Sequence, residues 1–257
     1  RCPRRQRDLI SRANRFMSTA PALFKDYEMA RYDLIIFDCD GVLVDSEILA
    51  AEVEARLLSD AGYPITAGEI GERFSGMTWR NILLAVESEA NIPLSAALLD
   101  LATAKLDERI KRELQPIPGV REAVAQLSEP RCICSNSTPE RVRMMLKKTG
   151  QLDIFEPNIF SAETLGPDRV KPKPDIFLHG AEKMGANPRN TLVIEDSVHG
   201  VTAAKAAGMR VVGFTGASHT TPTHADKLTE AGAETVIHRM DDLPAVATAL
   251  LEWTDAI

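Results

Sequence analysis

The sequence has no long hydrophobic run and few cysteines, and each shortage excludes a class of protein. Its most apolar runs, Leu34-Ile35-Ile36-Phe37 and Val211-Val212-Gly213-Phe214, end within a few positions, whereas a membrane-spanning helix needs about 18 or more apolar residues in a row. Four cysteines are present, and the pair Cys132 and Cys134 lacks the second pair of ligands that a structural zinc site needs. We therefore expect no membrane partner, reduced thiols and a cytoplasmic protein.

The chain also has fewer basic than acidic residues. The chain has 30 lysines and arginines against 37 aspartates and glutamates, a net charge of −7. Such a chain repels a phosphate backbone, so we expect no nucleic-acid partner. Its 257 residues suffice for one large domain or two smaller ones, and 44% hydrophobic and 26% charged residues are typical of a globular protein.

The first 28 residues differ from the rest in charge. They contain seven basic and three acidic residues. Their arginine and serine content loosely resembles a transit peptide, but they lack the apolar stretch of a secretory signal. Met29 stands directly before the first predicted strand. We interpret residues 1–29 as a basic N-terminal extension, either native or the product of an upstream reading of the start site.

Short apolar runs alternate with helical patterns along most of the chain. The runs predict buried parallel strands, at 32–37, 131–134, 158–160, 191–194, 210–213 and 234–237. Ser137-Thr138-Pro139-Glu140 begins a predicted helix that ends at Gly150, and another runs from Val198 to Ala207 before Gly208. This repetition predicts an α/β fold with a doubly wound, Rossmann-like parallel sheet formed by residues 30–44 and 117–257. Ligands are expected beyond the carboxyl ends of the strands.

Residues 45–116, between the first two predicted strands, contain no strand signal. They predict an inserted all-helical cap, with an apolar helix ending near Gly62, a helix over 79–90 capped by Thr78, and a helix over 96–114 capped by Ser95. A helical insertion at this point hangs over the strand ends, where an enzyme can use it as a lid.

Two aspartates, Asp38 and Asp40, stand two residues apart at the end of the first predicted strand. Their carboxylates repel each other, and a divalent cation such as Mg²⁺, which takes oxygen ligands, would compensate them. A turn whose aspartates accept hydrogen bonds from backbone N–H groups explains the same residues. The pair alone leaves both interpretations open.

Three further polar sets are expected at the same edge: Ser135-Asn136, Lys171 in the run Lys171-Pro172-Lys173-Pro174-Asp175, and Glu195-Asp196. Each has an ordinary alternative, as a helix cap, a surface lysine or helix-capping acids. Parallel strands, however, deliver their carboxyl ends to one edge. Together the four sets would supply cation ligands, hydroxyl and amide donors and a fixed positive charge, which is what a phosphoryl group requires.

The ordered set Asp38-Cys39-Asp40-Gly41-Val42, Ser135-Asn136, Lys171-Pro172 and Glu195-Asp196-Ser197 resembles the four motifs of the haloacid dehalogenase superfamily. The resemblance covers residues 32 to about 215. The helical insertion is similar to the cap of the subfamily that includes β-phosphoglucomutase, phosphoglycolate phosphatase and 6-phosphogluconate phosphatase.

The resemblance implies a role for each motif. Asp38 would be the nucleophile that forms an aspartyl phosphate, and Asp40 the general acid and base. Ser135, Asn136 and Lys171 would bind phosphate. Mg²⁺ would be held by Asp38, the backbone carbonyl of Asp40, Asp196 and, directly or through water, Glu195. These roles imply a Mg²⁺-dependent phosphatase for a small phosphorylated metabolite: a sugar, sugar-acid or hydroxy-acid phosphate.

The cap would set specificity. Six of its residues are candidates for facing the site: Glu47, Arg73, Met77, Thr78, Trp79 and Arg80. A cap arginine suits a substrate carboxylate or second phosphate, and each candidate is equally explained by a solvated helix face. His199 is a further residue that could touch the site.

Two other functions share these motifs. A phosphosugar mutase of the β-phosphoglucomutase type is the main alternative, although its relatives place an arginine directly after a Gly-x-Ser or Gly-x-Thr turn, and here Trp79 intervenes before Arg80. A phospho-accepting signalling module is a remote alternative, because receiver domains lack so large a cap. The sequence does not fix the oligomeric state, and we favour a monomer.

Overall fold

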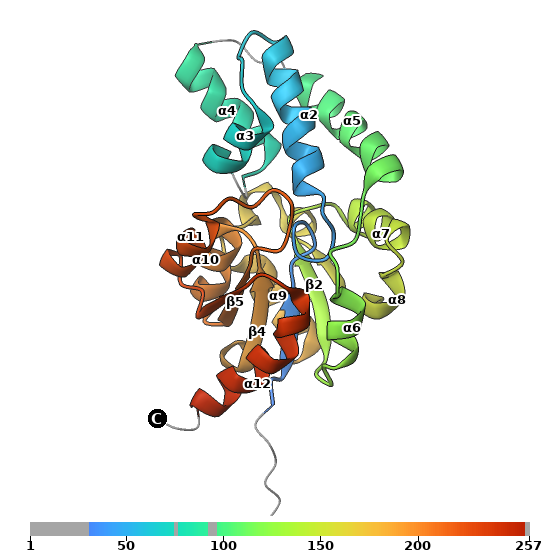
Figure 1. Ribbon diagram of the computed structural model, residues 1–257, viewed down its shortest axis with the longest axis vertical. Helices are drawn as coiled ribbons and strands as arrows, with labels where there is room; N and C mark the ends of the chain where they lie inside the picture. Colours follow the sequence, from blue (N-terminus) through green and yellow to red (C-terminus); the bar gives the residue numbers. More distant parts are fainter. Residues whose placement is uncertain (1–30, 75–76, 92–96, 255–257) are drawn as a thin grey trace, which may run out of the picture. The chain divides into compact units, whose positions relative to one another are not determined.

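The computed structural model describes residues 31–74, 77–91 and 97–254. The basic segment 1–29, Gly76 and the proposed cap residue Ser95 lie outside them. At the centre is a six-stranded parallel sheet with the strand order β3-β2-β1-β4-β5-β6 (Figure 1). Its strands are β1 (Leu34–Phe37), β2 (Arg131–Ser135), β3 (Ile159–Ser161), β4 (Thr191–Glu195), β5 (Arg210–Phe214) and β6 (Thr235–Ile237). The predicted doubly wound parallel sheet is confirmed, with each strand within two residues of its predicted bounds.

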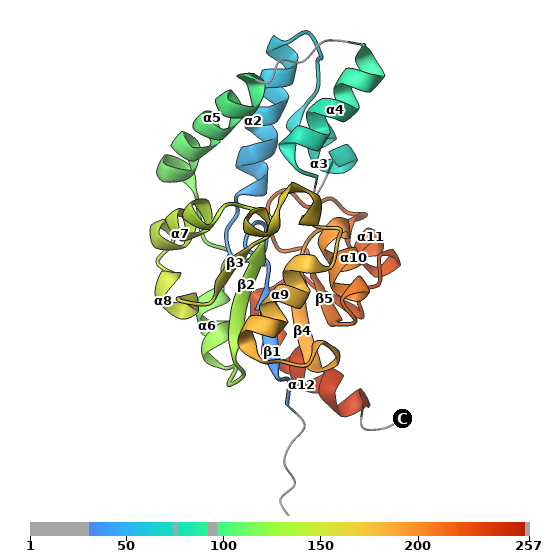
Figure 2. The same cartoon turned by 180° about the vertical axis from the view of Figure 1, so that it is seen from behind.

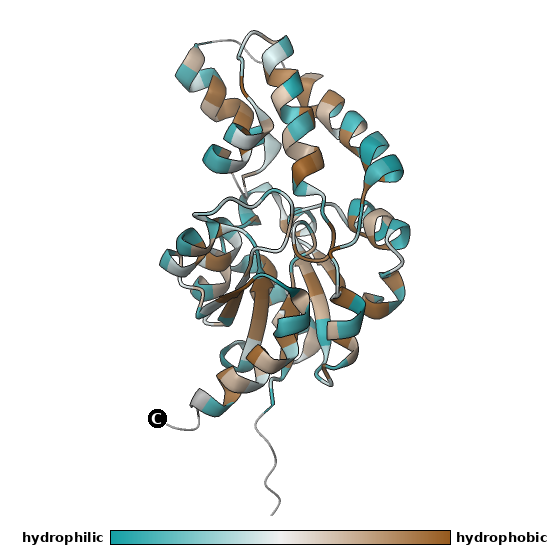
Figure 3. Cartoon of the chain, in the orientation of Figure 1, coloured by the Kyte–Doolittle hydropathy of each residue, from teal (hydrophilic) through white to brown (hydrophobic). Residues whose placement is uncertain are grey.

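Both faces of the sheet are covered, which explains the uninterrupted apolar runs. In β1, Ile35 and Phe37 join one hydrophobic core, and Leu34 and Ile36 join the other, because successive strand residues point to opposite faces. Figure 3 shows the strands as the most hydrophobic part of the fold. Helices contributing to the first core are α6 (Val120–Ala125), α7 (Pro139–Lys148), α8 (Leu152–Phe155) and α12 (Leu243–Thr254). Those contributing to the second are α9 (Asp175–Met184), α10 (Val198–Ala206) and α11 (His224–Glu230).

Local signals fix the ends of the two helices that lead away from the site. Thr138 accepts a hydrogen bond from the backbone N–H of Arg141 at the start of α7, and Pro139 occupies its first position. Ser197 caps α10 in the same way, through the N–H of Gly200. Gly208 follows α10 with a φ of +76°, a conformation that favours glycine. Both helices therefore begin directly after the strand ends that carry the polar motifs.

Four helices form a lobe between β1 and β2 in the chain. They are α2 (Glu47–Asp60), α3 (Ala67–Phe74), α4 (Trp79–Ala90) and α5 (Ala97–Glu113), and we call them the helical lobe. Thr78 caps α4 as predicted, accepting a hydrogen bond from Asn81 N. The lobe has its own hydrophobic clusters and lies beyond the carboxyl ends of the strands (Figures 1 and 2). The helical insertion is present, while the exact boundaries at 45 and 116 stay predictions.

The chain leaves the sheet for the lobe and returns from it at one place. Val44 and Pro116 form an antiparallel bridge. On either side of it, Asp45 N donates to Gln115 O at 3.0 Å and Ile117 N donates to Leu43 O at 3.0 Å. The two crossings are therefore hydrogen bonded to each other.

Short 3₁₀ helices complete the described chain. They are η1 (Ala162–Leu165), η2 (Pro167–Arg169), η3 (Pro188–Asn190) and η4 (Met240–Asp242). Of the helices in the described residues, none has both the length and the apolar character to span a membrane.

Candidate active site

The polar motifs meet at the carboxyl ends of the strands. Asp38 follows β1, Ser135 ends β2 and Glu195 ends β4. Lys171 reaches them from the loop between η2 and α9. All of these side chains line one cavity of about 1140 Å³ between the sheet edge and the helical lobe. The structure therefore brings together the residues that the sequence analysis placed at this edge.

Lys171 bridges two carboxylates. Its Nζ donates to Asp38 Oδ1 at 2.6 Å and to Glu195 Oε1 at 2.5 Å. Burial disfavours the charged lysine, but attraction to Asp38 and Glu195 and the two hydrogen bonds outweigh burial and raise the pKa of Lys171 above its ordinary value. Lys171 is therefore a permanent positive charge beside Asp38.

Asp40 is held by three hydroxyl groups. Ser46 Oγ donates to its Oδ1 at 2.6 Å, and Ser137 Oγ donates to its Oδ2 at 2.8 Å. Ser135 Oγ donates to Oδ2 at 3.3 Å. Neither Ser46 nor Ser137 was among the site residues expected from the sequence, although each stands next to one that was. This network fixes the orientation of the Asp40 carboxyl group in the cavity.

The loop after β2 is ordered by its own side chains. Ser135 Oγ accepts a hydrogen bond from Ser137 N at 3.0 Å. Asn136 Oδ1 accepts one from the backbone N–H of Lys171 at 3.0 Å. Asn136 lines the cavity and also fixes the loop that carries Lys171. Its predicted contact with phosphate stays a prediction.

Three buried carboxylates form a cluster with the geometry of a metal site. One oxygen each from Asp38, Glu195 and Asp196 lie within 4.8 Å of one another. Burial raises the pKa of Asp38 and of Asp196 well above the ordinary value, and repulsion from neighbouring carboxylates adds to this, against the attraction of Lys171. One lysine does not balance so many acids, so the cluster suits a divalent cation with oxygen ligands. Whether the backbone carbonyl of Asp40 joins it stays a prediction.

Two glycines make room for these acids. A Cβ atom at Gly41 would lie 1.9 Å from Asp196 Oδ2, and the φ of Gly41 is +74°. A Cβ atom at Gly200 would lie 1.8 Å from Glu195 Oε1. Glu195 is completely buried, and its Oε2 accepts hydrogen bonds from Ser197 N at 2.9 Å and Ser197 Oγ at 3.0 Å. The acids occupy space that any other residue at these positions would fill.

His219 is a site residue that the sequence analysis missed. Its Nε2 lies 3.2 Å from Asp196 Oδ2, and its side chain is buried. It lines the cavity, whereas His199 is not among the described residues that do. The sequence contained a signal for this residue, namely its position after the end of β5. Polar residues at that end of a parallel strand point toward the same edge of the sheet as the other motifs.

The candidate specificity residues in the helical lobe fall into two groups, those that line the cavity and one that does not. Glu47, Met77, Thr78, Trp79 and Arg80 line the cavity. Arg73 is not among the described lining residues. Its Nη2 instead pairs with Glu89 Oε2 at 2.5 Å and its Nη1 donates to Tyr63 Oη at 2.9 Å. The expectation that Arg73 faces the site is therefore not met, because its guanidinium joins α3 to α4 on the outside of the lobe.

Acidic residues of α2 face the cavity. Burial, followed by repulsion from Asp196 and Asp40, raises the pKa of Glu47 to about 8. Glu54, which the sequence analysis did not name, lines the same cavity. Burial, followed by repulsion from Glu47, raises its pKa to about 8 as well. The lobe thus presents two acids to the cavity.

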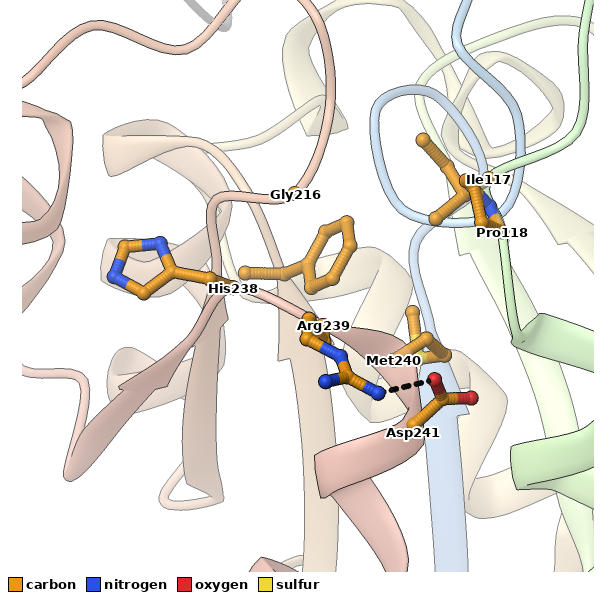
Figure 4. A pocket seen from close by; sticks show the side chains of 8 residues that line it. Ile117, Pro118, Gly216, His238, Arg239, Met240 and Asp241 are labelled. Atoms are coloured by element: carbon orange, nitrogen blue, oxygen red, sulfur yellow. Dashed lines mark hydrogen bonds and ion pairs between the residues drawn. The ribbon is translucent and has the colours of Figure 1, made fainter.

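A second, smaller cavity of about 160 Å³ lies where the chain returns from the lobe (Figure 4). Its lining includes Pro118, Phe214, His238 and Arg239, and Arg239 pairs with Asp241 at 2.9 Å. It shares no lining residue with the large cavity. The acidic cluster belongs to the large cavity alone.

Comparisons with known proteins give a consistent picture. The model of the haloacid dehalogenase-like hydrolases matches residues 32–208. The chain is 28% identical to 6-phosphogluconate phosphatase of Escherichia coli over 78% of this chain and 90% of the relative. It is 31% identical to a phosphorylated carbohydrates phosphatase of Thermotoga maritima over 69% and 82%. A crystal structure of a conserved haloacid dehalogenase-like protein of unknown function from Agrobacterium tumefaciens is 65% identical, with a TM-score of 0.80, over 85% of this chain and 99% of that one.

Proposed function

Because the chain belongs to the haloacid dehalogenase-like hydrolase family, we propose that its cavity hydrolyses the phosphate ester of a small phosphorylated sugar or sugar derivative through Asp38. The chain is a phosphatase, as its named relatives are. The observation that supports the role of Asp38 is its ion pair with Lys171 at 2.6 Å, in a cavity that Ser135 and Asn136 also line.

Asp38 is the proposed nucleophile. Its carboxylate oxygen forms a bond to phosphorus while the bond from phosphorus to the ester oxygen breaks, which leaves an aspartyl phosphate and the substrate alcohol. Lys171 fixes the orientation of the carboxylate through Oδ1. Ser135 and the backbone N–H groups at the start of α7 are the proposed donors to the phosphoryl oxygens.

Asp40 is the proposed general acid and base. In its protonated form it gives a proton to the departing ester oxygen. It then takes a proton from the water that attacks the aspartyl phosphate, so that inorganic phosphate leaves and both side chains return to their starting states. The hydroxyl groups of Ser46 and Ser137 hold Asp40 in place for both transfers.

We propose Mg²⁺ as the metal, held by Asp38, Glu195, Asp196 and the backbone carbonyl of Asp40. The three buried carboxylates fit it, because they are hard oxygen ligands whose negative charge one lysine does not balance. When bound, the ion supplies positive charge that offsets the repulsion between a carboxylate nucleophile and a phosphate.

The mutase alternative has less support, because the named curated relatives above are phosphatases. The cytoplasmic location and the monomeric state stay predictions.

The experiment is a phosphate-release assay with Mg²⁺ over a panel of sugar, sugar-acid and hydroxy-acid phosphates and p-nitrophenyl phosphate. We expect release by the wild-type protein and none by Asp38→Asn. If nuclear magnetic resonance showed that the protein isomerises a sugar phosphate and releases no free phosphate, the result would favour the mutase instead. Full activity in Asp38→Asn would contradict the covalent route.

A further inference from the structure

Helix α2 presents acids to the cavity at two depths. Glu47 and Glu54 are seven residues apart, about two helical turns, so they share one face of the helix and are separated by about 10 Å along its axis. Repulsion from Asp40 and Asp196 acts on Glu47, which places Glu47 at the phosphate end. Among the described residues, Glu47 is the charged group that acts in this way on Glu54. Figure 1 shows α2 rising from the sheet edge into the lobe, and Glu54 lies about two turns farther along this helix than Glu47.

The surroundings of Glu54 carry little other charge. Among the described residues of the helical lobe that line the cavity, the charged ones are Glu47, Glu54 and the exposed Arg80. The uncharged polar ones include Thr78, Asn81 and Thr103, and most of the rest are apolar. Across the described chain, no hydrogen bond or ion pair joins the Glu54 carboxyl group to another residue. A carboxyl group that faces a cavity without a protein partner is available to a ligand.

We propose that Glu54 is a specificity-determining residue that hydrogen bonds the hydroxyl groups at the end of a sugar chain remote from its phosphate. The enzyme would then favour neutral, polyhydroxylated chains of five or six carbons over sugar acids. This inference rests on the proposed function, because it assumes that Asp38 binds the phosphate end of the same substrate.

The hydrogen-bonding capacity and the charge of the remote group decide whether it is accepted. A carboxylate at the end of the substrate only accepts hydrogen bonds, and Glu47 and Glu54 would repel it whenever either side chain is ionised. A hydroxyl group both donates and accepts hydrogen bonds, and so does a protonated carboxyl group. A hydroxyl group can therefore pair with Glu54 in either protonation state, whereas an ammonium group only donates and pairs with the ionised state alone.

Chain length supplies a second criterion. A substrate held by its phosphate at Asp38 must pass Glu47 before it reaches Glu54. On this path a three-carbon ester such as glycerol 3-phosphate should end before Glu54, which lies about two helical turns beyond Glu47, whereas a six-carbon chain extends farther toward it. The contribution of Glu54 should therefore appear only with long substrates.

The experiment compares esters that differ at one carbon. Sorbitol 6-phosphate, 6-phosphogluconate and 1-amino-1-deoxysorbitol 6-phosphate share a six-carbon chain and carry an alcohol, a carboxylate and an ammonium group at C1. Glycerol 3-phosphate is the short control, and p-nitrophenyl phosphate reports the basic phosphatase activity. The measured quantity is kcat/KM at pH 7 for each ester.

The variants are Glu54→Leu, which removes the hydrogen bond, Glu54→Gln, which keeps it, and Glu72→Gln, an exposed lobe residue outside the cavity lining, as the matched control. For sorbitol 6-phosphate we expect Glu54→Leu to lower kcat/KM about tenfold, the ratio that one lost hydrogen bond produces. We expect Glu54→Gln and Glu72→Gln to stay near wild type. With glycerol 3-phosphate, all variants should match the wild type.

A wild-type preference for the carboxylate or the ammonium ester over the alcohol would overturn the proposal. So would an equal loss on long and short esters in Glu54→Leu, which would indicate a structural role. In both cases the protein would still hydrolyse p-nitrophenyl phosphate. If the proposed function itself were wrong, no ester would release phosphate, and the Glu54 proposal would be overturned as well.

Discussion

Replacing Gly200 by alanine should destabilise the protein, although alanine favours a helix more than glycine does. Gly200 lies in the first turn of α10, where the substitution alone would stabilise the fold by about 0.5–1 kcal/mol. The new Cβ atom, however, would lie 1.8 Å from Oε1 and 1.9 Å from Cδ of Glu195. The Glu195 carboxylate must therefore move away from Lys171 and Ser197, the partners that bind it in a fully buried position.

The size of the effect follows from the broken ion pair. Separating one partner from a buried pair costs about 3–5 kcal/mol, so the net loss should be about 2–4 kcal/mol once the helix gain of about 0.5–1 kcal/mol is subtracted. Urea denaturation followed by circular dichroism, in protein stripped of metal with a chelator, measures the free energy of unfolding.

A matched control is available in α3. A Cβ atom at Gly71 would meet nothing nearer than His219 O at 3.9 Å, so Gly71→Ala should gain about 0.5–1 kcal/mol. If Gly200→Ala were as stable as wild type while Gly71→Ala behaved as expected, the argument that Glu195 fills the space beside Gly200 would be refuted.

Three further predictions concern the site. Asp40→Asn should slow turnover about 10²- to 10⁴-fold, and mass spectrometry should detect phosphorylated Asp38 in this variant during turnover. Rapid hydrolysis with no phosphorylated Asp38 detected would argue against Asp40 as the base. Gly41→Ala should weaken Mg²⁺ binding, measured by calorimetry, because its Cβ atom would displace Asp196; unchanged affinity would exclude Asp196 as a ligand. Because the pKa of Glu54 is raised from 4.5 to about 8 in the fold, wild-type stability should be unaffected by this group below about pH 4.5 and fall as pH rises to about 8. Glu54→Gln should therefore become more stable relative to wild type across that window in urea titrations, and a constant difference would contradict the raised pKa.

Much of the fold could be predicted because its signals are local. Runs such as Leu34–Phe37 are apolar on both faces, and that pattern identifies a buried parallel strand without reference to the rest of the chain. The cap of α4 at Thr78 was likewise visible in the sequence. Most site motifs were predictable because parallel strands end at one edge, which brings Asp38 after β1 close to Glu195 at the end of β4.

The parts that were not predicted depend on side-chain direction. Three charged residues stand close together on α2, at Glu52, Glu54 and Arg56, and only the packing of the lobe decides that Glu54 faces the cavity while Glu52 pairs with Arg109. Arg73 illustrates the same limit, because its partners Glu89 and Tyr63 come from elsewhere in the lobe. Periodicity locates a helix, but the rotation of its faces against its neighbours is a tertiary property.

The paired crossings at Val44 and Pro116 have a consequence for how this protein family diversifies. The segment that leaves the sheet for the lobe and the segment that returns from it are hydrogen bonded to each other. The whole lobe is therefore attached to the sheet at a single place, as the turn of a hairpin is attached to its two strands. Transplanting a different lobe at this place would leave the strand register and the Asp38–Lys171 pair untouched. Reaction chemistry and molecular recognition are thus separable, and chimaeras whose foreign lobe begins after Ser46, which hydrogen bonds Asp40, and ends before Pro116 should keep the first while exchanging the second.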